Sequence, residues 1–423
     1  MEKPKLFNKN FTLLWLGQSV SQLGTGAGFI GLLWWVQMTT GSALALGTLA
    51  MVQTLIAVAL APIAGALVDR LDRKGIIVAT DVIRGLTNLA LGWLALTGQL
   101  TMTWVYVLAS VNAVCNQFFN PAIAAAIPLL VPNERLEQAN SLNQVSINLV
   151  NIIGFSAGGV LVAFMGIPFL LLANGFSFLV SAFSELFITI PALVREKQKL
   201  TFGLFGRDIK EGLVYVMDNK ALFKIMQVAM VLNFFSAPIF ILLPLFVASH
   251  MGAGSEVYGF LMAAQMAGAF TATMVMSTTS IVKSNLWIVR WGISGLGLAV
   301  VGLVLAPANL WGVHIALFGA MGVLNASVNV YFGTVLQRAT KPEFMGKVFG
   351  LLGTVVHGLQ PLSQGLSGLV AEFVRLPIIY AVCGGSVALG GIRFGLIPGI
   401  MPLLRGEKAA VKEAVEQPAP ATG

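Results

Sequence analysis

Charged residues are scarce in this chain of 423 residues: only 10% are Asp, Glu, Lys or Arg, while 57% are hydrophobic. Soluble globular proteins carry about 25% charged residues and about 45–50% apolar ones. The composition therefore excludes an ordinary soluble enzyme. The net charge of +8 does not indicate a nucleic-acid partner, because the basic residues lie between apolar runs and form no amphipathic soluble surface.

Cysteine is nearly absent as well. Cys115 and Cys383 both lie inside apolar runs, so they indicate neither a disulfide framework nor a metal cluster. The sequence also lacks a P-loop, the usual nucleotide-binding motif. We therefore expect no cofactor, no bound metal and no direct use of ATP.

Long apolar runs are what the sequence has in abundance. A membrane-spanning helix needs about 20 apolar residues, and twelve windows of this kind lie near residues 11–36, 44–68, 76–98, 102–130, 139–165, 168–190, 221–248, 256–281, 284–306, 310–337, 344–373 and 376–404. We expect an all-α membrane protein with twelve transmembrane helices in two six-helix pseudo-repeats. The expected domains are a bundle over 1–190, a cytoplasmic linker over 191–219, a bundle over 220–405 and a disordered tail over 406–423.

The basic residues predict how these helices are oriented. If the N-terminus is cytoplasmic, all of the 25 Lys and Arg residues fall on the cytoplasmic side except Arg375, on the outer side, and Arg393, inside the last run. Cytoplasmic loops of membrane proteins carry an excess of Lys and Arg. The distribution therefore predicts that both termini are cytoplasmic.

Reporter fusions test this topology. A reporter that is active only outside the cytoplasm should stay inactive when it is fused at Lys220 or Gly406, and it should be active at His250, in an expected outer loop. Activity at Lys220 or Gly406 would refute the predicted orientation.

The two halves of the sequence repeat weakly at a constant offset, which aligns Asn116 with Asn325 and Asn120 with Asn329. Both copies have the same orientation in the membrane, because six helices separate them. Parallel six-helix repeats are typical of transporters whose binding site lies at the repeat interface near the bilayer midplane.

A short motif follows the second apolar run. It reads G-A-L-V-D-R-L-D-R-K from residue 65, and its principal residues are Gly65, Asp69, Arg70, Arg73 and Lys74. The motif resembles the loop signature G-x-L-x-D-R-x-G-R-K of the major facilitator superfamily, with Asp72 where a glycine is usual. Together with PLLVPNERL at 128–136 and KPEFMGKVFGLLG at 341–353, it is similar to the macrolide-efflux branch of drug–proton antiporters.

The resemblance implies a secondary active transporter in a bacterial inner membrane, not an enzyme. We expect a monomer in the lipid bilayer that exports amphipathic small molecules by alternating access in exchange for protons. Two alternatives stay open: a lipid or siderophore exporter of the same fold, and a membrane sensor that binds without transporting. Two departures bear on proton coupling, because Asn112 stands where such families often have an arginine and Phe155 where they often have a proline.

The resemblance also implies a role for Asp69. In the family this acid caps a neighbouring helix of the other half and joins basic residues at the cytoplasmic gate. A carboxylate at a helix N-terminus stabilises by about 0.3–1 kcal/mol. The alternative is that the basic residues of the motif are only topology signals, which leaves Asp69 unexplained.

The variant Asp69→Asn tests the gate. It should lower transport with little loss of folded protein, because it removes a latch and leaves the packing of the core intact. Efflux and expression level are the measurements. Wild-type efflux by a well-expressed variant would contradict the gate role, and unfolding would return Asp69 to a structural role.

Polar side chains inside the apolar runs must face protein or water, because an amide that faces lipid is costly. The resemblance implies a substrate cavity there, since the fourth and tenth helices line the central cavity in the family. Asn112, Asn116 and Asn120 recur every four residues and so share one helix face. The predicted cavity residues are Gln18, Gln22, Asn112, Asn116, Asn120, Asn325, Asn329, His357 and Gln360. For any single amide the alternative is an interhelical hydrogen bond, worth about 0.6 kcal/mol on average.

Glu185, Asp81 and His357 are the candidates for proton coupling, since ionisable residues inside a membrane are rare and usually functional. Glu185 could instead extend toward the cytoplasmic surface. Asp81 is three residues from Arg84, and we expect these two to pair with each other or with the gate. His357 could instead form a hydrogen bond to a neighbouring helix.

Overall fold

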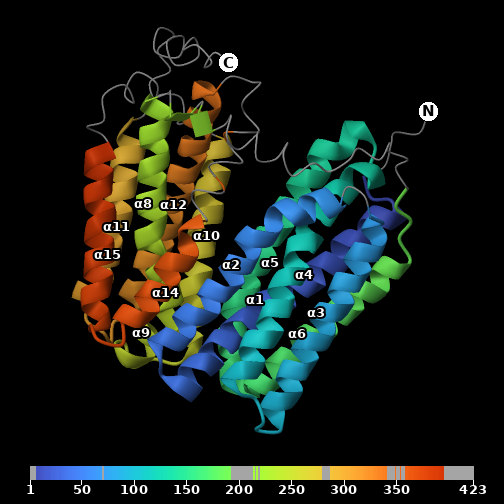
Figure 1. Cartoon of the computed structure of the whole chain (residues 1–423), viewed down its shortest axis with the longest axis horizontal. Coiled ribbons are helices and arrows are strands. Elements are labelled where there is room, and N and C mark those ends of the chain that lie inside the picture. The colour runs from blue at the N-terminus through green and yellow to red at the C-terminus, as the bar shows by residue number, and fades with distance from the viewer. Residues whose placement is uncertain are drawn as a thin grey trace. The chain divides into compact units, whose positions relative to one another are not determined.

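The computed structural model describes residues 6–68, 71–191, 220–278, 286–340 and 358–394, together with the isolated positions 213, 214, 216, 217, 348 and 353. All regular secondary structure within these ranges is helical (Figure 1). The chain divides into two units. Unit 1 comprises Met1–Gln198 and Pro244–Ala263, and unit 2 comprises Lys199–Leu243 and Ala264–Gly423.

Six long helices make up most of unit 1. They are α1 (Lys9–Thr40), α2 (Ala43–Val68), α3 (Arg73–Leu96), α4 (Met102–Leu130), α5 (Leu136–Met165) and α6 (Ile167–Leu186), with the short 3-10 helix η1 (Asn133–Arg135) before α5. Helix α3 packs along α6, and α1 packs along both α5 and α6 (Figure 1). Unit 1 is therefore a helical bundle in which α6 packs against both α1 and α3.

The helices of unit 2 are α8 (Lys220–Ile241), α11 (Leu286–Leu305), α12 (Trp311–Ala339), α14 (Gln360–Val370) and α15 (Leu376–Phe394). Helix α9 (Leu243–Ser249) and helix α10 (Ser255–Thr278) contain two of the three points where the chain passes between the two units. Helix α11 packs between α12 and α15, and α8 contacts α14 and α15. Apolar residues of α8, α11, α12 and α15 form one core cluster, with Ile225, Ile293, Tyr331 and Val387 among its buried members.

Nine of the described helices are long and apolar enough to cross a membrane: α2, α3, α4, α5 together with η1, α6, α8, α10, α12 and α15. Helix α1 has 32 residues and is also long enough to span a bilayer, but polar side chains such as Gln18, Ser21 and Gln22 interrupt its apolar character. The twelve-helix count and the two-repeat organisation stay predictions. So do the domain boundaries, since the tail over 406–423 and most of the linker over 191–219 lie outside the described residues.

Side-chain caps explain where two helices begin. Asn8 accepts a hydrogen bond from the backbone N–H of Phe11 at the start of α1. Asp72 accepts from the backbone N–H groups of Lys74 and Gly75, at 3.2 and 2.9 Å, at the start of α3. An N-cap acid stabilises a helix by about 1 kcal/mol relative to alanine, so Asp72 has a structural reason to replace the glycine that is usual in the motif.

Glycines let α1 and α5 approach closely. A Cβ atom on Gly154 would lie 3.2 Å from the Cα of Gly26, and one on Gly158 would lie 2.7 Å from the Cα of Ala27. Small residues at such crossings allow backbones to come into direct contact, which is a common way for membrane helices to associate. The α1–α5 contact therefore depends on the absence of side chains at these positions.

Replacing Gly158 by alanine should destabilise the protein by about 1–3 kcal/mol, because α1 and α5 must separate to admit the new methyl group. The matched control is Gly385→Ala, because a Cβ there meets no atom within 4 Å. That change should be neutral or stabilising, since alanine favours helix over glycine. Thermal unfolding of the purified variants measures both effects, and equal melting temperatures would contradict the close-contact role.

Candidate functional site

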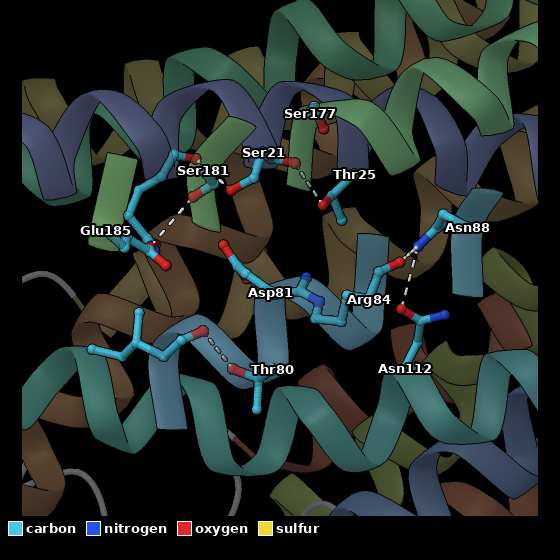
Figure 2. Close-up of polar contacts among 12 residues, drawn as sticks. Ser21, Thr25, Thr80, Asp81, Arg84, Asn88, Asn112, Ser177, Ser181 and Glu185 are labelled. Carbon is cyan, nitrogen blue, oxygen red and sulfur yellow. Dashed lines mark hydrogen bonds and ion pairs between the residues drawn. The ribbon is translucent and has the colours of Figure 1, made fainter. Parts of the chain in front are cut away.

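Three ionisable side chains lie buried together inside unit 1 (Figure 2). Asp81 and Arg84 come from α3 and Glu185 comes from α6, and their exposed fractions are 0%, 6% and 1%. Removing a charge from water costs several kcal/mol unless partners compensate it. We call these three residues the charged cluster.

Asp81 and Arg84 form an ion pair within α3. The Arg84 Nη1 and the Asp81 Oδ1 are 3.5 Å apart, which confirms the pairing that their spacing predicts. The guanidinium also lies over two aromatic rings, 4.0 Å from the centre of Phe178 and 5.1 Å from that of Phe119. Cation–π contacts of this kind add stabilisation when they are desolvated, so Arg84 is held by the rings as well as by Asp81.

Glu185 is enclosed by polar side chains of α1 and α6. Its Oε1 accepts hydrogen bonds from Gln18 Nε2 and Ser181 Oγ, each at 3.3 Å. In Figure 2 the Asp81 carboxylate points from α3 toward Ser181 and Glu185, and the two acids are close enough to interact electrostatically. Since Glu185 is only 1% exposed, the alternative in which it extends to the cytoplasmic surface is wrong.

Both acids keep one buried oxygen without a hydrogen-bond donor. These oxygens are Asp81 Oδ2 and Glu185 Oε2, and the Arg84 Nε also has no acceptor. Buried polar atoms are almost always paired in folded proteins, so unpaired ones call for an explanation. An unpaired carboxylate oxygen is an available position for a proton.

An amide ladder continues from the charged cluster across three helices. Asn174 of α6 donates to Asn88 Oδ1 of α3 at 3.0 Å, and Asn88 donates to Asn112 Oδ1 of α4 at 3.3 Å and to the Arg84 carbonyl at 2.8 Å. Asn88 and Asn174 are not among the site residues predicted from the sequence. Asn88 could have been found, since it lies one turn after Arg84 on the same face of α3.

The amide ladder ends at Asn112, the position at which related families often have an arginine. Arg84 lies on the neighbouring helix, and Asn88 links its backbone to the Asn112 side chain. A buried guanidinium is therefore present in this part of unit 1, on α3 instead of α4. Among the predicted cavity residues of unit 1, Gln18 is buried, whereas Gln22, Asn112 and Asn116 are partly exposed and Asn120 is exposed.

The motif at residues 65–74 is only partly described, because Asp69 and Arg70 lie outside the described residues. Arg73 donates to the Ala125 carbonyl of α4 at 3.4 Å, and Lys74 donates to the Leu186 carbonyl at the end of α6 at 2.7 Å. Basic groups near helix C-termini interact favourably with the helix dipole. Arg73 and Lys74 therefore fasten the start of α3 to two neighbours, beyond any effect on topology.

A cavity of about 250 Å³ lies within unit 2. Asn325, Asn329 and Gln360 line it, so three of the predicted cavity residues come together there. Asn233 of α8, which is not among the residues predicted from the sequence, lines it too. The sequence signal that could have identified Asn233 is a single amide within an apolar run. His357 lies outside the described residues.

A family model described as transmembrane secretion effector matches residues 4–416, almost the whole chain. The chain belongs to this family of major facilitator transporters. It is accordingly a multi-pass membrane transporter, and its relatives are transporters and not enzymes.

Two curated relatives are efflux proteins. The transporter is 25% identical over 376 residues to macrolide efflux protein A of Streptococcus pyogenes, covering 88% of this chain and 92% of that protein. It is 26% identical over 391 residues to the multidrug efflux pump Tap of Mycolicibacterium fortuitum, covering 90% and 93%. Among solved structures, a variant of the nucleoside transporter NupG aligns with a TM-score of 0.70 at 14% identity, covering 92% of this chain and 99% of that one. The structural likeness concerns the fold alone.

Proposed function

We propose that this transporter exports amphipathic small molecules in exchange for protons, and that Asp81 and Glu185 carry the proton. The observation that supports coupling is the charged cluster, in which two buried carboxylates lie near one guanidinium that pairs with Asp81. The names of the relatives, macrolide efflux protein A and multidrug efflux pump Tap, support an amphipathic substrate of the macrolide or drug type.

The charge balance of the cluster argues for a single exchangeable proton. With both acids ionised the cluster carries one net negative charge in a medium of low dielectric, where like charges repel strongly. With one acid protonated the charges of Arg84 and the remaining carboxylate cancel. Two interacting acids of this kind titrate as a pair and not as separate residues, so the pair holds one proton and releases it when water reaches it.

The structure of the cluster suits such a cycle. Glu185 has hydrogen-bond donors in Gln18 and Ser181, which stabilise its ionised form. Asp81 has Arg84 for the same purpose. Either acid can therefore hold the negative charge while the other holds the proton, and a movement between α3 and α6 would change which of them does.

Alternating access supplies the movement in this proposal. The substrate and the proton use separate sites and compete through the conformation of the transporter. Both termini are cytoplasmic, the protein acts as a monomer in the bacterial plasma membrane, and Asp69 with its neighbouring basic residues closes the cytoplasmic side.

The variants Glu185→Gln and Asp81→Asn test the coupling, because each keeps the size of the side chain and removes the titratable group. Proton-driven efflux should fall about tenfold or more, as expected when an acid–base group is lost, and the remaining transport should lose its pH dependence. Counterflow of substrate without a gradient should persist, because it needs no net proton movement. Proteoliposomes with an imposed pH gradient, with and without a protonophore, provide both measurements.

The matched control is Thr80→Val, next to Asp81 on α3. Thr80 is buried, and its hydroxyl bonds only to carbonyls of its own helix, so its loss should leave the pH profile unchanged. If both acid variants keep the wild-type pH dependence, neither acid carries the coupling. If the wild-type protein shows no counterflow of any efflux substrate, the chain binds without transporting.

A further inference from the structure

We propose that the cavity of unit 2 binds an uncharged, hydrogen-bonding ring of the substrate, so that the transporter prefers neutral molecules bearing hydroxyl or carbonyl groups to organic cations. The inference rests on the proposed export function and adds the chemical class of the substrate. It also assigns Asn233 and Asn329 as residues that determine specificity.

The first argument is the chemistry of the cavity wall. Its polar side chains are those of Asn233, Ser236, Asn325, Asn329 and Gln360, and none of the described residues that line it is ionisable. A cation that leaves water needs an opposite charge to offset its lost hydration. The described residues of this wall include no Asp or Glu, so they offer a cation no carboxylate. An uncharged ligand meets no such cost.

The second argument is the hydrogen-bond state of the amides. Asn329 donates to Asn325 Oδ1 at 2.9 Å, which leaves this pair presenting the Asn325 NH₂ as a donor and the Asn329 carbonyl oxygen as an acceptor. Asn233 donates to the Ala229 carbonyl of its own helix at 2.9 Å, so its side-chain oxygen remains an acceptor. A wall with both donors and acceptors suits hydroxyl groups, which both donate and accept, and carbonyl groups, which accept.

The third argument is the shape and size of the cavity. Phe240 and Phe332 stand among the apolar side chains that complete the wall, and flat aromatic surfaces pack well against a ring. Pockets that enclose a drug-sized molecule measure roughly 300–1,000 Å³, whereas this cavity has about 250 Å³. It therefore accommodates one ring with its substituents and not a whole macrocycle.

The cavity also lies at a suitable depth. Asn325 is at the middle of α12 (Trp311–Ala339), and Asn233 lies beyond the middle of α8 (Lys220–Ile241), away from both helix ends. Substrate sites of transporters with repeated bundles lie near the bilayer midplane. Polar side chains at that depth would be costly if they faced lipid. Facing a cavity, they can form hydrogen bonds with a bound ligand.

Binding to the purified full-length protein tests the inference without any ion gradient. The probes are chloramphenicol, an uncharged aromatic molecule with hydroxyl groups and an amide, and tetraphenylphosphonium, a permanent cation with no hydrogen-bonding group. Equilibrium dialysis should show wild-type protein binding chloramphenicol about tenfold or more tightly than the cation. Asn233→Leu should weaken chloramphenicol binding roughly two- to tenfold, the effect of one lost hydrogen bond, and leave the cation unaffected.

Asn329→Asp separates recognition from a merely structural role. The added carboxylate should strengthen tetraphenylphosphonium binding by about fivefold or more through charge attraction, and it should weaken chloramphenicol binding. A structural defect would weaken both probes together. The matched control is Asn140→Asp, which makes the same change in the exposed first turns of α5 in unit 1, and it should alter neither affinity.

Three results would overturn the inference: no saturable chloramphenicol binding to wild-type protein, equal affinity for both probes, or parallel changes for both probes in Asn233→Leu and Asn329→Asp. Failure of the proposed export function is seen separately, as efflux of chloramphenicol from proteoliposomes that a protonophore leaves unchanged. Since binding is measured at equilibrium without a gradient, either statement can fail while the other holds.

Discussion

The ion pair between Asp81 and Arg84 sets the arrangement of unit 1, because an apolar membrane protein must satisfy its buried charges from within. Three further helices supply side chains that stabilise these buried charges. Helix α6 supplies Phe178 beneath the guanidinium and Glu185 beside Asp81, α4 supplies Phe119, and α1 supplies Gln18. The helices around the ion pair thus supply the polar and aromatic side chains that stabilise the buried charges. When both acids are ionised, the cluster still carries one uncompensated negative charge.

Close packing of α3 on α6 brings the two acids together. A Cβ on Gly85 would lie 3.2 Å from the Gly175 carbonyl oxygen, and a Cβ on Gly175 would lie 2.8 Å from the Leu89 backbone nitrogen. The glycines let the two backbones approach, and this approach places Asp81 and Glu185 where each feels the other. A looser crossing would leave two separately solvated acids, so the electrostatics of the cluster depend on the small residues at this crossing.

The two units divide the polar chemistry between them. Unit 1 holds buried charged side chains that have few hydrogen-bonding or ionic partners, whereas neutral amides and aromatic rings line the cavity of unit 2. This division suits the proposed exchange of a proton for an uncharged substrate, since a proton site gains from burial and a substrate site from open, reversible hydrogen bonds. It also explains why Asn112 need not be an arginine: the guanidinium of unit 1 comes from Arg84 on α3.

Apolar run length, basic-residue asymmetry and the motif at residues 65–74 sufficed to predict a helical membrane transporter of the major facilitator superfamily, and the Asp81–Arg84 pair followed from a spacing of three. These features are local, because helix periodicity places neighbours in sequence on one face. The contact between Glu185 and Asp81, the ladder through Asn88 and Asn174, and the entry of Asn233 into the cavity with Asn325 and Asn329 are not local. Each joins helices that are distant in sequence, and which faces meet depends on side-chain volumes at the crossings, a property that no single apolar run carries.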